Sequence, residues 1–206
     1  MKVIKQGAES KIILFEKKCT VLKKRISKKY RLPEIDRKFI RLRTRSEARI
    51  IEKIRRLGIN TPRVLRVNEE EGEIEMEFID GVTLKEFLLK SNDVNTIKKI
   101  ARKLGKIIAR LHENNLIHGD ITTSNMILKD NKLYLIDFGL AKHSWKIEEK
   151  AEDLLVLYYA LKSTHFDVFE LFWKSFIFSY KRNYKEGVRV LERLEEIKKR
   201  GRYASR

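Results

Sequence analysis

The sequence predicts an α+β protein with a small β-rich lobe followed by a larger, mostly helical lobe. Near the N-terminus, the stretch VIKQGAESKIILFEKKCTVLKKRI is apolar or alternating and rich in β-branched residues, which is typical of strands with a turn at Gly7. From about residue 149, apolar residues recur at helical spacing almost to the end. The pair Asp80-Gly81 marks a break between the two patterns. We therefore expect one domain over 1–206, with lobes at 1–79 and 80–206.

The elements of the first lobe follow from local signals. After the strands, residues 27–45 read as a basic connector that contains Pro33. The stretch RSEARIIEKIRRLGI then predicts a helix, because its isoleucines recur at helical spacing and Gly58 suits the position after the last turn. TPRVLRV and GEIEMEFI read as two more strands.

The second lobe opens with a helix over 94–115, which Asp93 or Asn95 can cap. A hairpin follows, made of MIL, a KDNK turn and LYLID. The last helices are expected at AEDLLVLYYAL, 166–183 and 184–199, before a basic, frayed tail RGRYASR. We assign to the core the aromatic residues of these helices, namely Tyr158, Tyr159, Phe166, Phe169, Phe172, Trp173, Phe176 and Phe178.

The amino-acid composition indicates the temperature and the compartment in which the protein works. Charged residues make up 37% of the chain, a bias typical of proteins from hot environments. Cys19 is the single cysteine, which excludes a disulfide framework and a cysteine-based metal site, and we expect it to be a buried strand residue. Neither an apolar leader nor a run long enough to span a bilayer is present, so the sequence predicts a cytoplasmic protein without membrane contact.

The net charge of +18 favours a polyanionic partner. Residues 17–66 hold 19 Lys or Arg against 4 Asp or Glu, and residues 181–206 hold 10 against 4. These two clusters, the second with the tail RGRYASR, predict contact with an RNA backbone. Solvated faces or acidic protein partners are the alternative explanations.

The stretch HGDITTSNMIL followed by DFG carries the chemistry. Phosphoryl transfer needs metals that hold the phosphates, a cation that neutralises them and a carboxylate near the attacking hydroxyl. Asp120 suits the carboxylate, and Asn125 and Asp137 offer oxygen ligands of the kind that Mg²⁺ prefers. The predicted hairpin between Asn125 and Asp137 lets these side chains converge.

HxDxxxxN followed by DFG resembles the signature of the protein-kinase-like fold, here in a minimal bilobal form. The resemblance implies a lysine on the third strand, either Lys23 or Lys24, and Lys23 is favoured because it shares a face with Val21. Glu47 shares the buried stripe of the next helix and is its expected partner. Nucleotide contacts are then expected from Gly7, Ala8, Glu9, Ser10, Val21, Lys23, Met76, Glu77, Ile79 and Ile127.

Three departures from the kinase pattern bear on regulation. QGAES has one glycine instead of a full glycine-rich loop. Gly119 stands where regulated kinases carry an arginine, and no A-P-E motif follows DFG. Asp153 resembles the aspartate that tethers the catalytic loop. We expect a minimal kinase that is not switched by phosphorylation.

KQGAES, KKYRLPEID, RTRSEAR, GDITTSNM, IDFGLA and RGR resemble the family of small, RIO-like atypical kinase subunits of the KEOPS (EKC) complex, over essentially the whole chain. The resemblance implies an ATP- and Mg²⁺-dependent Ser/Thr kinase or ATPase, with Mn²⁺ as a substitute, and favours an archaeal source. It also implies a monomer within a hetero-complex that contains the tRNA-threonylcarbamoyl-transferring subunit and other KEOPS subunits.

Three other functions stay open at this point. A small-molecule kinase of the aminoglycoside or choline type also carries HGD, although only 67 residues follow DFG here. A RIO-type ribosome-assembly factor is a second alternative, which TTSNM and RTRSEAR disfavour. The third is a nucleotide-bound scaffold without turnover, against which the full set of expected site residues argues.

Overall fold

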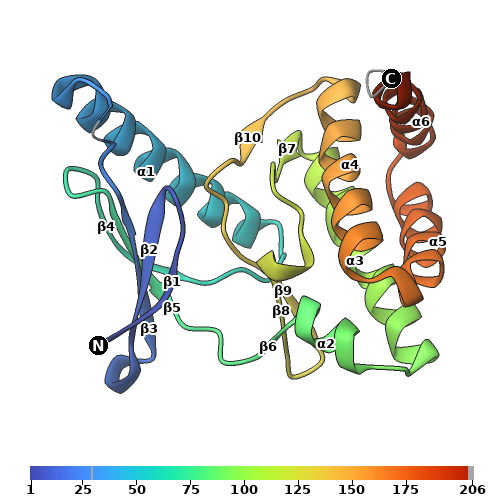
Figure 1. Ribbon diagram of the computed structural model, residues 1–206, viewed down its shortest axis with the longest axis horizontal. Coiled ribbons are helices and arrows are strands. Elements are labelled where there is room, and N and C mark those ends of the chain that lie inside the picture. Colours follow the sequence, from blue (N-terminus) through green and yellow to red (C-terminus); the bar gives the residue numbers. More distant parts are fainter. Residues whose placement is uncertain (29, 204–206) are drawn as a thin grey trace. The chain divides into compact units, whose positions relative to one another are not determined.

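The computed structural model describes residues 1–28 and 30–203, with side chains up to Arg200. These residues form two compact units, Met1–Asp80 and Gly81–Arg206, which meet in the chain at the Asp80-Gly81 pair (Figure 1). The fold is kinase-like in its elements, with strands in the first unit and helices dominating the second. Within the described residues, no helix combines the length and apolar content needed to cross a membrane.

The first unit is a five-stranded antiparallel sheet with one long helix. The sheet order is β1-β2-β3-β5-β4, from β1 (Lys2–Gln6), β2 (Ser10–Phe15), β3 (Thr20–Arg25), β5 (Glu73–Glu77) and β4 (Val64–Asn68). Helix α1 (Pro33–Arg56) contacts β4 and β5. The core between them is built on Val21, Ala48, Ile74 and Met76. The strands and the helix over 45–56 agree with the sequence prediction.

Two expectations in this unit are wrong. Helix α1 begins at Pro33, so residues 33–45 are helical instead of a connector. Proline suits the first helical position, and Glu34 and Asp36 in the first turn favour the helix dipole. Cys19 is exposed, because it follows the short 3₁₀ helix η1 (Glu16–Lys18) in the left-handed region at φ 49°.

The second unit is built on helices. It contains α2 (Leu84–Lys90), α3 (Val94–Glu113), α4 (Ile147–Thr164), α5 (Phe166–Asn183) and α6 (Gly187–Tyr203), with the 3₁₀ turn η2 (Thr123–Asn125). Asp93 caps α3 by accepting from two backbone amides. Two small antiparallel sheets join it: β6 (Val82–Thr83), β8 (Met126–Lys129) and β9 (Lys132–Leu135), and β7 (Leu116–Ile117) with β10 (Lys142–His143).

The hairpin predicted before DFG is present. Strands β8 and β9 pair in antiparallel register, and Met126 lies opposite Leu135. Asp130 and Asn131 form the turn with φ of 49° and 58°, the left-handed values that a two-residue hairpin requires and that Asp and Asn tolerate. The hairpin brings the end of β9, and with it Asp137, back toward η2.

Part of the aromatic set lies outside the core. Tyr158, Phe169, Phe172, Trp173 and Phe176 are buried, as expected. Tyr159, Phe166 and Phe178 are exposed, so their assignment to the core is wrong. The error arises because a helix that is apolar on all sides has no periodic pattern to indicate which side faces solvent. The terminal helix extends to Tyr203, beyond its expected end at 199, and the last tail residues, 204–206, lie outside the described part.

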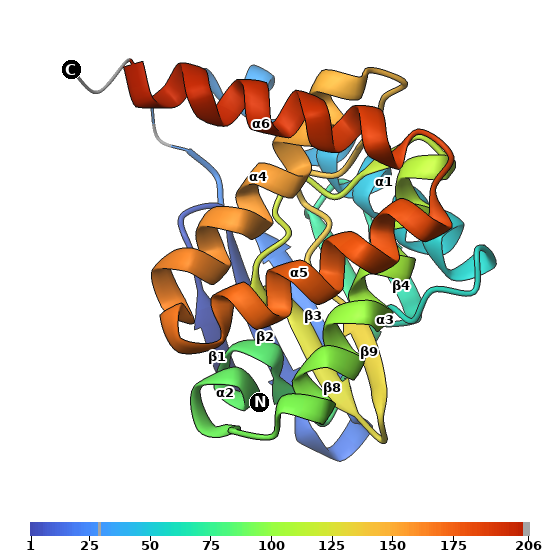
Figure 2. The same cartoon turned by 90° about the vertical axis from the view of Figure 1, so that its right-hand side faces the viewer.

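Helices α3 and α5 approach closely at Gly105 (Figure 2). A Cβ at this position would lie 2.5 Å from the Phe176 carbonyl oxygen and 2.9 Å from Ser179 Cβ. We therefore expect Gly105→Ala to lower the free energy of unfolding by about 2 kcal/mol, although alanine is normally the better helix former. Urea denaturation measures this change in stability. Gly7→Ala is the control, because a Cβ at Gly7 would lie 3.9 Å from its nearest neighbour. A stabilised Gly105→Ala protein would contradict the packing.

Candidate active site

Some of the expected site residues lie on β3 and α1 of the first unit. Strand alternation buries Val21, Lys23 and Arg25 on one face. Lys23 Nζ lies 2.6 Å from Glu47 Oε1, and both side chains are almost completely buried. Lys24, the alternative lysine, faces the other way and pairs with Glu73 at 2.8 Å. The pairing predicted for Lys23 and Glu47 is therefore present.

Arg25 belongs to the same cluster and was missed from the sequence. Its Nη2 lies 2.5 Å from Glu47 Oε2, so one buried carboxylate holds two cations. The signal was available, because Arg25 follows Lys23 at the two-residue period of a strand. Glu47 is thus fixed at both oxygens, which orients the Lys23 ammonium group.

The residues expected around a nucleotide base lie in three places. Val21 is opposite Met76 across β3 and β5, and both are buried. Glu77 and Ile79 follow at the end of the first unit, where the Glu77 amide donates to the Arg63 carbonyl at 2.9 Å. In the second unit, half-buried Ile127 lies on β8, opposite Thr83 and Tyr134.

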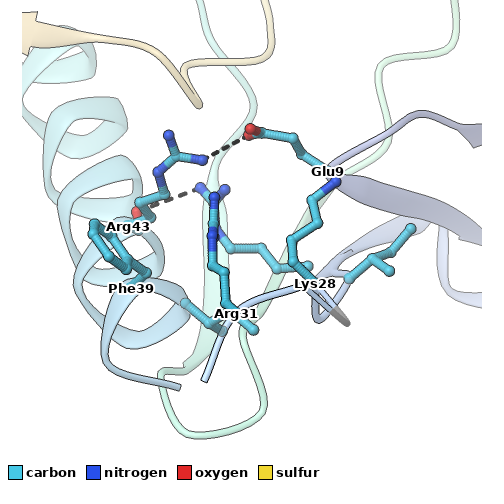
Figure 3. Close-up of a pocket in the computed structure, with 8 residues that line it drawn as sticks. Glu9, Lys28, Arg31, Phe39 and Arg43 are labelled. Atoms are coloured by element: carbon cyan, nitrogen blue, oxygen red, sulfur yellow. Dashed lines mark hydrogen bonds and ion pairs between the residues drawn. The ribbon is translucent and has the colours of Figure 1, made fainter. Parts of the chain in front are cut away.

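The turn from Gly7 to Ser10 is closed on itself. The Gly7 amide donates to the Ser10 carbonyl at 3.0 Å, and the Ile26 amide donates to the Glu9 carbonyl at 2.9 Å. The Lys28 ammonium group donates to the Ala8 carbonyl. Glu9 Oε2 lies 2.8 Å from Nη1 of Arg43 on α1, and Figure 3 shows this ion pair. This hydrogen bond lowers the pKa of Glu9, so the turn carries a charged carboxylate.

The second unit holds the loop that contains Asp120 and Asn125. Asn125 Nδ2 donates to Asp120 Oδ2 at 2.7 Å and to the Asp120 carbonyl at 3.1 Å. The Ile136 amide donates to the Asn125 carbonyl at 3.0 Å, which ties the approach to Asp137 onto the same loop. Asp137 has φ of 64°, a strained value for a residue that is not glycine. The three predicted side chains therefore belong to one connected loop system.

This donor set suits Mg²⁺. Asn125 donates through Nδ2, which leaves its Oδ1 available as an oxygen ligand, and Asp137 supplies a carboxylate from the same loop system. Mg²⁺ typically takes one or two protein oxygens and completes its shell with water and substrate phosphates. Among the described residues, no cluster of three His, Cys, Asp or Glu forms a self-sufficient metal cage. The oxygen ligands of Asn125 and Asp137 therefore suit a metal ion whose coordination is completed by nucleotide phosphates and water.

Asp153 holds this loop from α4. Its Oδ1 accepts from the Gly119 amide at 2.8 Å, and its Oδ2 accepts from the His118 amide at 2.9 Å. The tethering role expected for Asp153 is matched by these contacts. His112 and Tyr180 extend the network: His112 Nε2 lies 3.2 Å from Asp153 Oδ2, and His112 Nδ1 lies 2.7 Å from the Tyr180 hydroxyl. Sequence reasoning did not find these two residues.

The structure gives a physical reason for Gly119. Its φ is 82°, and a Cβ there would lie 2.5 Å from the Leu140 carbonyl oxygen. A larger residue would combine backbone strain with a clash against the segment after DFG. HGD therefore reflects a close approach of two backbone segments.

His118 gives the loop a pH dependence. Burial lowers its pKa, against the opposing effects of Asp153, Asp120 and Asp137. The unfolded chain takes up a proton near the ordinary histidine pKa of about 6.5, and the folded site does not. Stability should therefore fall below that pH by up to about 1 kcal/mol per pH unit.

Urea midpoints at neutral and mildly acidic pH measure this effect. His118→Asn should reduce this pH dependence. His165 is also buried with a lowered pKa and contributes in the same direction. Equal pH dependence in wild type and His118→Asn would contradict the assignment.

The chain is similar to known proteins over most of its length. Residues 10–156 match the model of the RIO domain. The KEOPS complex subunit Bud32 of Pyrococcus abyssi is 42% identical over 216 residues, covering 100% of this chain and 98% of that protein. The EKC/KEOPS complex subunit bud32 of Dictyostelium discoideum is 39% identical, covering 97% of this chain and 82% of that protein.

Longer relatives also match. A probable bifunctional tRNA threonylcarbamoyladenosine biosynthesis protein of Methanosarcina mazei is 38% identical over 98% of this chain. The chain spans 36% of that relative's length. The match therefore covers one part of a longer protein.

A solved structure shows the same fold. It is the Rio2 kinase–ADP/Mg²⁺–phosphoaspartate complex from Chaetomium thermophilum, with a TM-score of 0.64 and 16% identity, covering 98% of this chain and 70% of that one. The fold is thus kinase-like, as the sequence predicted. On the full-length identity and the RIO-domain match together, the chain belongs to the RIO family of atypical kinases and, within it, to the Bud32 subunits.

Proposed function

We propose that this protein is a Mg-ATP-dependent Ser/Thr kinase or ATPase that acts as a KEOPS subunit in tRNA threonylcarbamoyladenosine modification. The observations that support the proposal are two groups of interacting side chains, one in each unit. One unit holds the buried Lys23–Glu47 pair. The other holds Asp120 and Asn125, joined by a 2.7 Å hydrogen bond. These are the parts that phosphoryl transfer requires.

In this proposal the two units are the lobes of one domain, and each residue has a separate task. Mg-ATP supplies the reactive phosphoryl group and the metal charge when it is bound. Lys23, oriented by Glu47, neutralises phosphate oxygens. Asn125 and Asp137 hold metal through oxygen atoms, and Asp120 orients the attacking hydroxyl or water and accepts its proton.

Apolar side chains would contact the nucleotide base. Val21 and Met76 offer one surface and Ile127 the other, while backbone groups from Glu77 to Ile79 provide polar contacts. The turn from Gly7 to Ser10 covers the phosphates with fewer amides than a full glycine-rich loop. Mn²⁺ would substitute for Mg²⁺, because both accept the same oxygen ligands.

The partners follow from the names of the relatives. KEOPS subunits and, among them, the tRNA-threonylcarbamoyl-transferring subunit are the proposed assembly, with this chain as a monomer in the cytoplasm. Contact with tRNA through basic surfaces, including the terminal tail, completes the proposal.

Following labelled γ-phosphate from Mg-ATP tests this function. The purified chain is assayed alone, and then with its tRNA-modifying partner and tRNA. Label on protein would support a Ser/Thr kinase. Free phosphate that appears mainly with partner and tRNA would support an ATPase that serves the modification. If neither product forms in any condition, the protein does not turn over ATP, and a nucleotide-bound scaffold becomes the better explanation.

A further inference from the structure

One face of α3 carries cations that no carboxylate neutralises. Lys98, Lys99, Arg102, Lys103 and Lys106 line a concave surface together with Ser179 of α5. The helix sequence VNTIKKIARKLGKIIARLHE contains no acidic residue before its last position. Within the part of the chain that the structure describes, none of these cations forms an ion pair with a carboxylate. We call these five cations the α3 basic face.

The first unit has the larger charge excess in sequence, and there the structure pairs some of the cations with carboxylates. The cations of residues 17–66 that form ion pairs with carboxylates include Lys23, Lys24, Arg25, Arg31, Arg41, Arg43 and Arg45. Figure 3 shows one case, in which Glu9 lies against Arg43. An exposed cation that already has a carboxylate partner gains less from a phosphate. Among the described residues, the α3 basic face is therefore a contiguous set of cations without a carboxylate partner.

The spacing of the α3 cations suits a regular row of anions. Lys98, Arg102 and Lys106 recur every four residues, and exposed Arg110 continues the row. At a rise of 1.5 Å per residue, neighbours are about 6 Å apart along the helix axis. Lys99 and Lys103 form a second, parallel row. Like charges at this spacing destabilise an isolated helix, and a bound polyanion would relieve that repulsion.

The basic face is also rigidly supported. Helices α3 and α5 lie side by side (Figure 2), and their close approach at Gly105 fixes their separation. Ser179 Oγ donates to the Arg102 carbonyl at 2.7 Å, in the floor of the concave surface. The cations therefore extend from a fixed backbone, and only their side chains adjust to a partner.

We propose that the α3 basic face binds the phosphate backbone of a double-stranded RNA segment. Lysines predominate, and they contact phosphate as compact point charges. No aromatic side chain lines the surface, so the stacking that supports recognition of unpaired bases is absent from it. A straight row of cations fits a regular duplex backbone. This proposal deepens the RNA contact of the proposed function and places it on α3.

Fluorescence anisotropy with a labelled RNA duplex of about 16 base pairs tests this site. The full chain is compared with the variant that combines Lys99→Ala, Lys103→Ala and Lys106→Ala. We expect affinity to fall roughly 30-fold and the slope of log affinity against log salt to decrease by about 2 to 3. Alanine is a strong helix former, so α3 should remain intact.

A matched control removes three exposed lysines elsewhere in the same unit, at Lys85, Lys90 and Lys162. It should change RNA affinity less than about threefold. Equal weakening by the two triple variants would overturn the site and leave only non-specific charge. Competition by polyglutamate as strong as that by RNA of equal charge would overturn the choice of RNA and indicate an acidic protein partner.

Nucleotide turnover measured on the same proteins separates this proposal from the proposed function. Normal turnover with unchanged RNA affinity in the α3 variant would reject the site alone. If the α3 variant loses RNA affinity and neither it nor the wild-type protein turns over nucleotide, the result would support the site and reject the enzymatic proposal.

Discussion

Replacing Asp120 by asparagine is expected to lower phosphoryl transfer by about 10³-fold, because the amide does not accept a proton from the attacking group. The variant keeps an oxygen in the place of Asp120 Oδ2, which accepts from Asn125 Nδ2 at 2.7 Å. The loop should therefore keep its conformation, and nucleotide affinity should change little. Initial rates of labelled phosphate transfer or release measure the effect.

Asp130→Asn is the control for this variant. Asp130 is exposed in the β8–β9 turn at φ of 49°, a conformation that asparagine also tolerates. The Asp130→Asn substitution makes the same change in charge and size outside the site, so the rate of phosphoryl transfer should stay unchanged. A fully active Asp120→Asn protein would support the scaffold function.

Asp153→Asn is expected to lower the free energy of unfolding by about 3 kcal/mol. Asp153 is buried and accepts from the His118 and Gly119 amides, with His112 as a third neighbour. An asparagine turns an NH₂ group toward at least one of these donors. The loop that holds Asp120 then loses its anchor, so turnover should fall together with stability.

Denaturation by urea and the phosphate assay, run on the same preparation, measure both effects. Glu152→Gln is the matched control, because Glu152 is the neighbouring residue on α4 and is exposed. It should alter stability by less than about 0.5 kcal/mol. Wild-type stability in Asp153→Asn would show that the tether does not hold the loop.

Local patterns predicted the elements that position the site. The alternation of β3 placed Val21 and Lys23 on one face, and helical spacing placed Glu47 on the buried stripe of α1. The HGD to DFG spacing predicted a hairpin, and the structure contains it between η2 and Asp137. These signals come from residues that are close in sequence, so they can be recognised without knowledge of tertiary contacts.

Other features depend on contacts between distant residues. The link from His112 to Asp153 and Tyr180 joins three helices, and no sequence period relates them. The start of α1 at Pro33 was missed because a basic, proline-containing stretch resembles a loop, whereas proline at the first helical position stabilises the start. The distribution of unpaired charge was likewise hidden, because residue counts do not reveal which arginines have carboxylate partners.

Nucleotide binding by variants of the proposed site residues tests the central claim, that the chain binds Mg-nucleotide through Lys23 and Asp137. Lys23→Ala leaves Arg25 to neutralise Glu47, and Asp137→Ala removes one proposed metal ligand. Calorimetric titration with Mg-ADP should show affinity at least about 10-fold weaker in each, with Mg²⁺ dependence reduced in Asp137→Ala. Lys24→Ala, on the other face of β3, should bind as wild type does. Wild-type affinity in either Lys23→Ala or Asp137→Ala would contradict the role proposed for that residue.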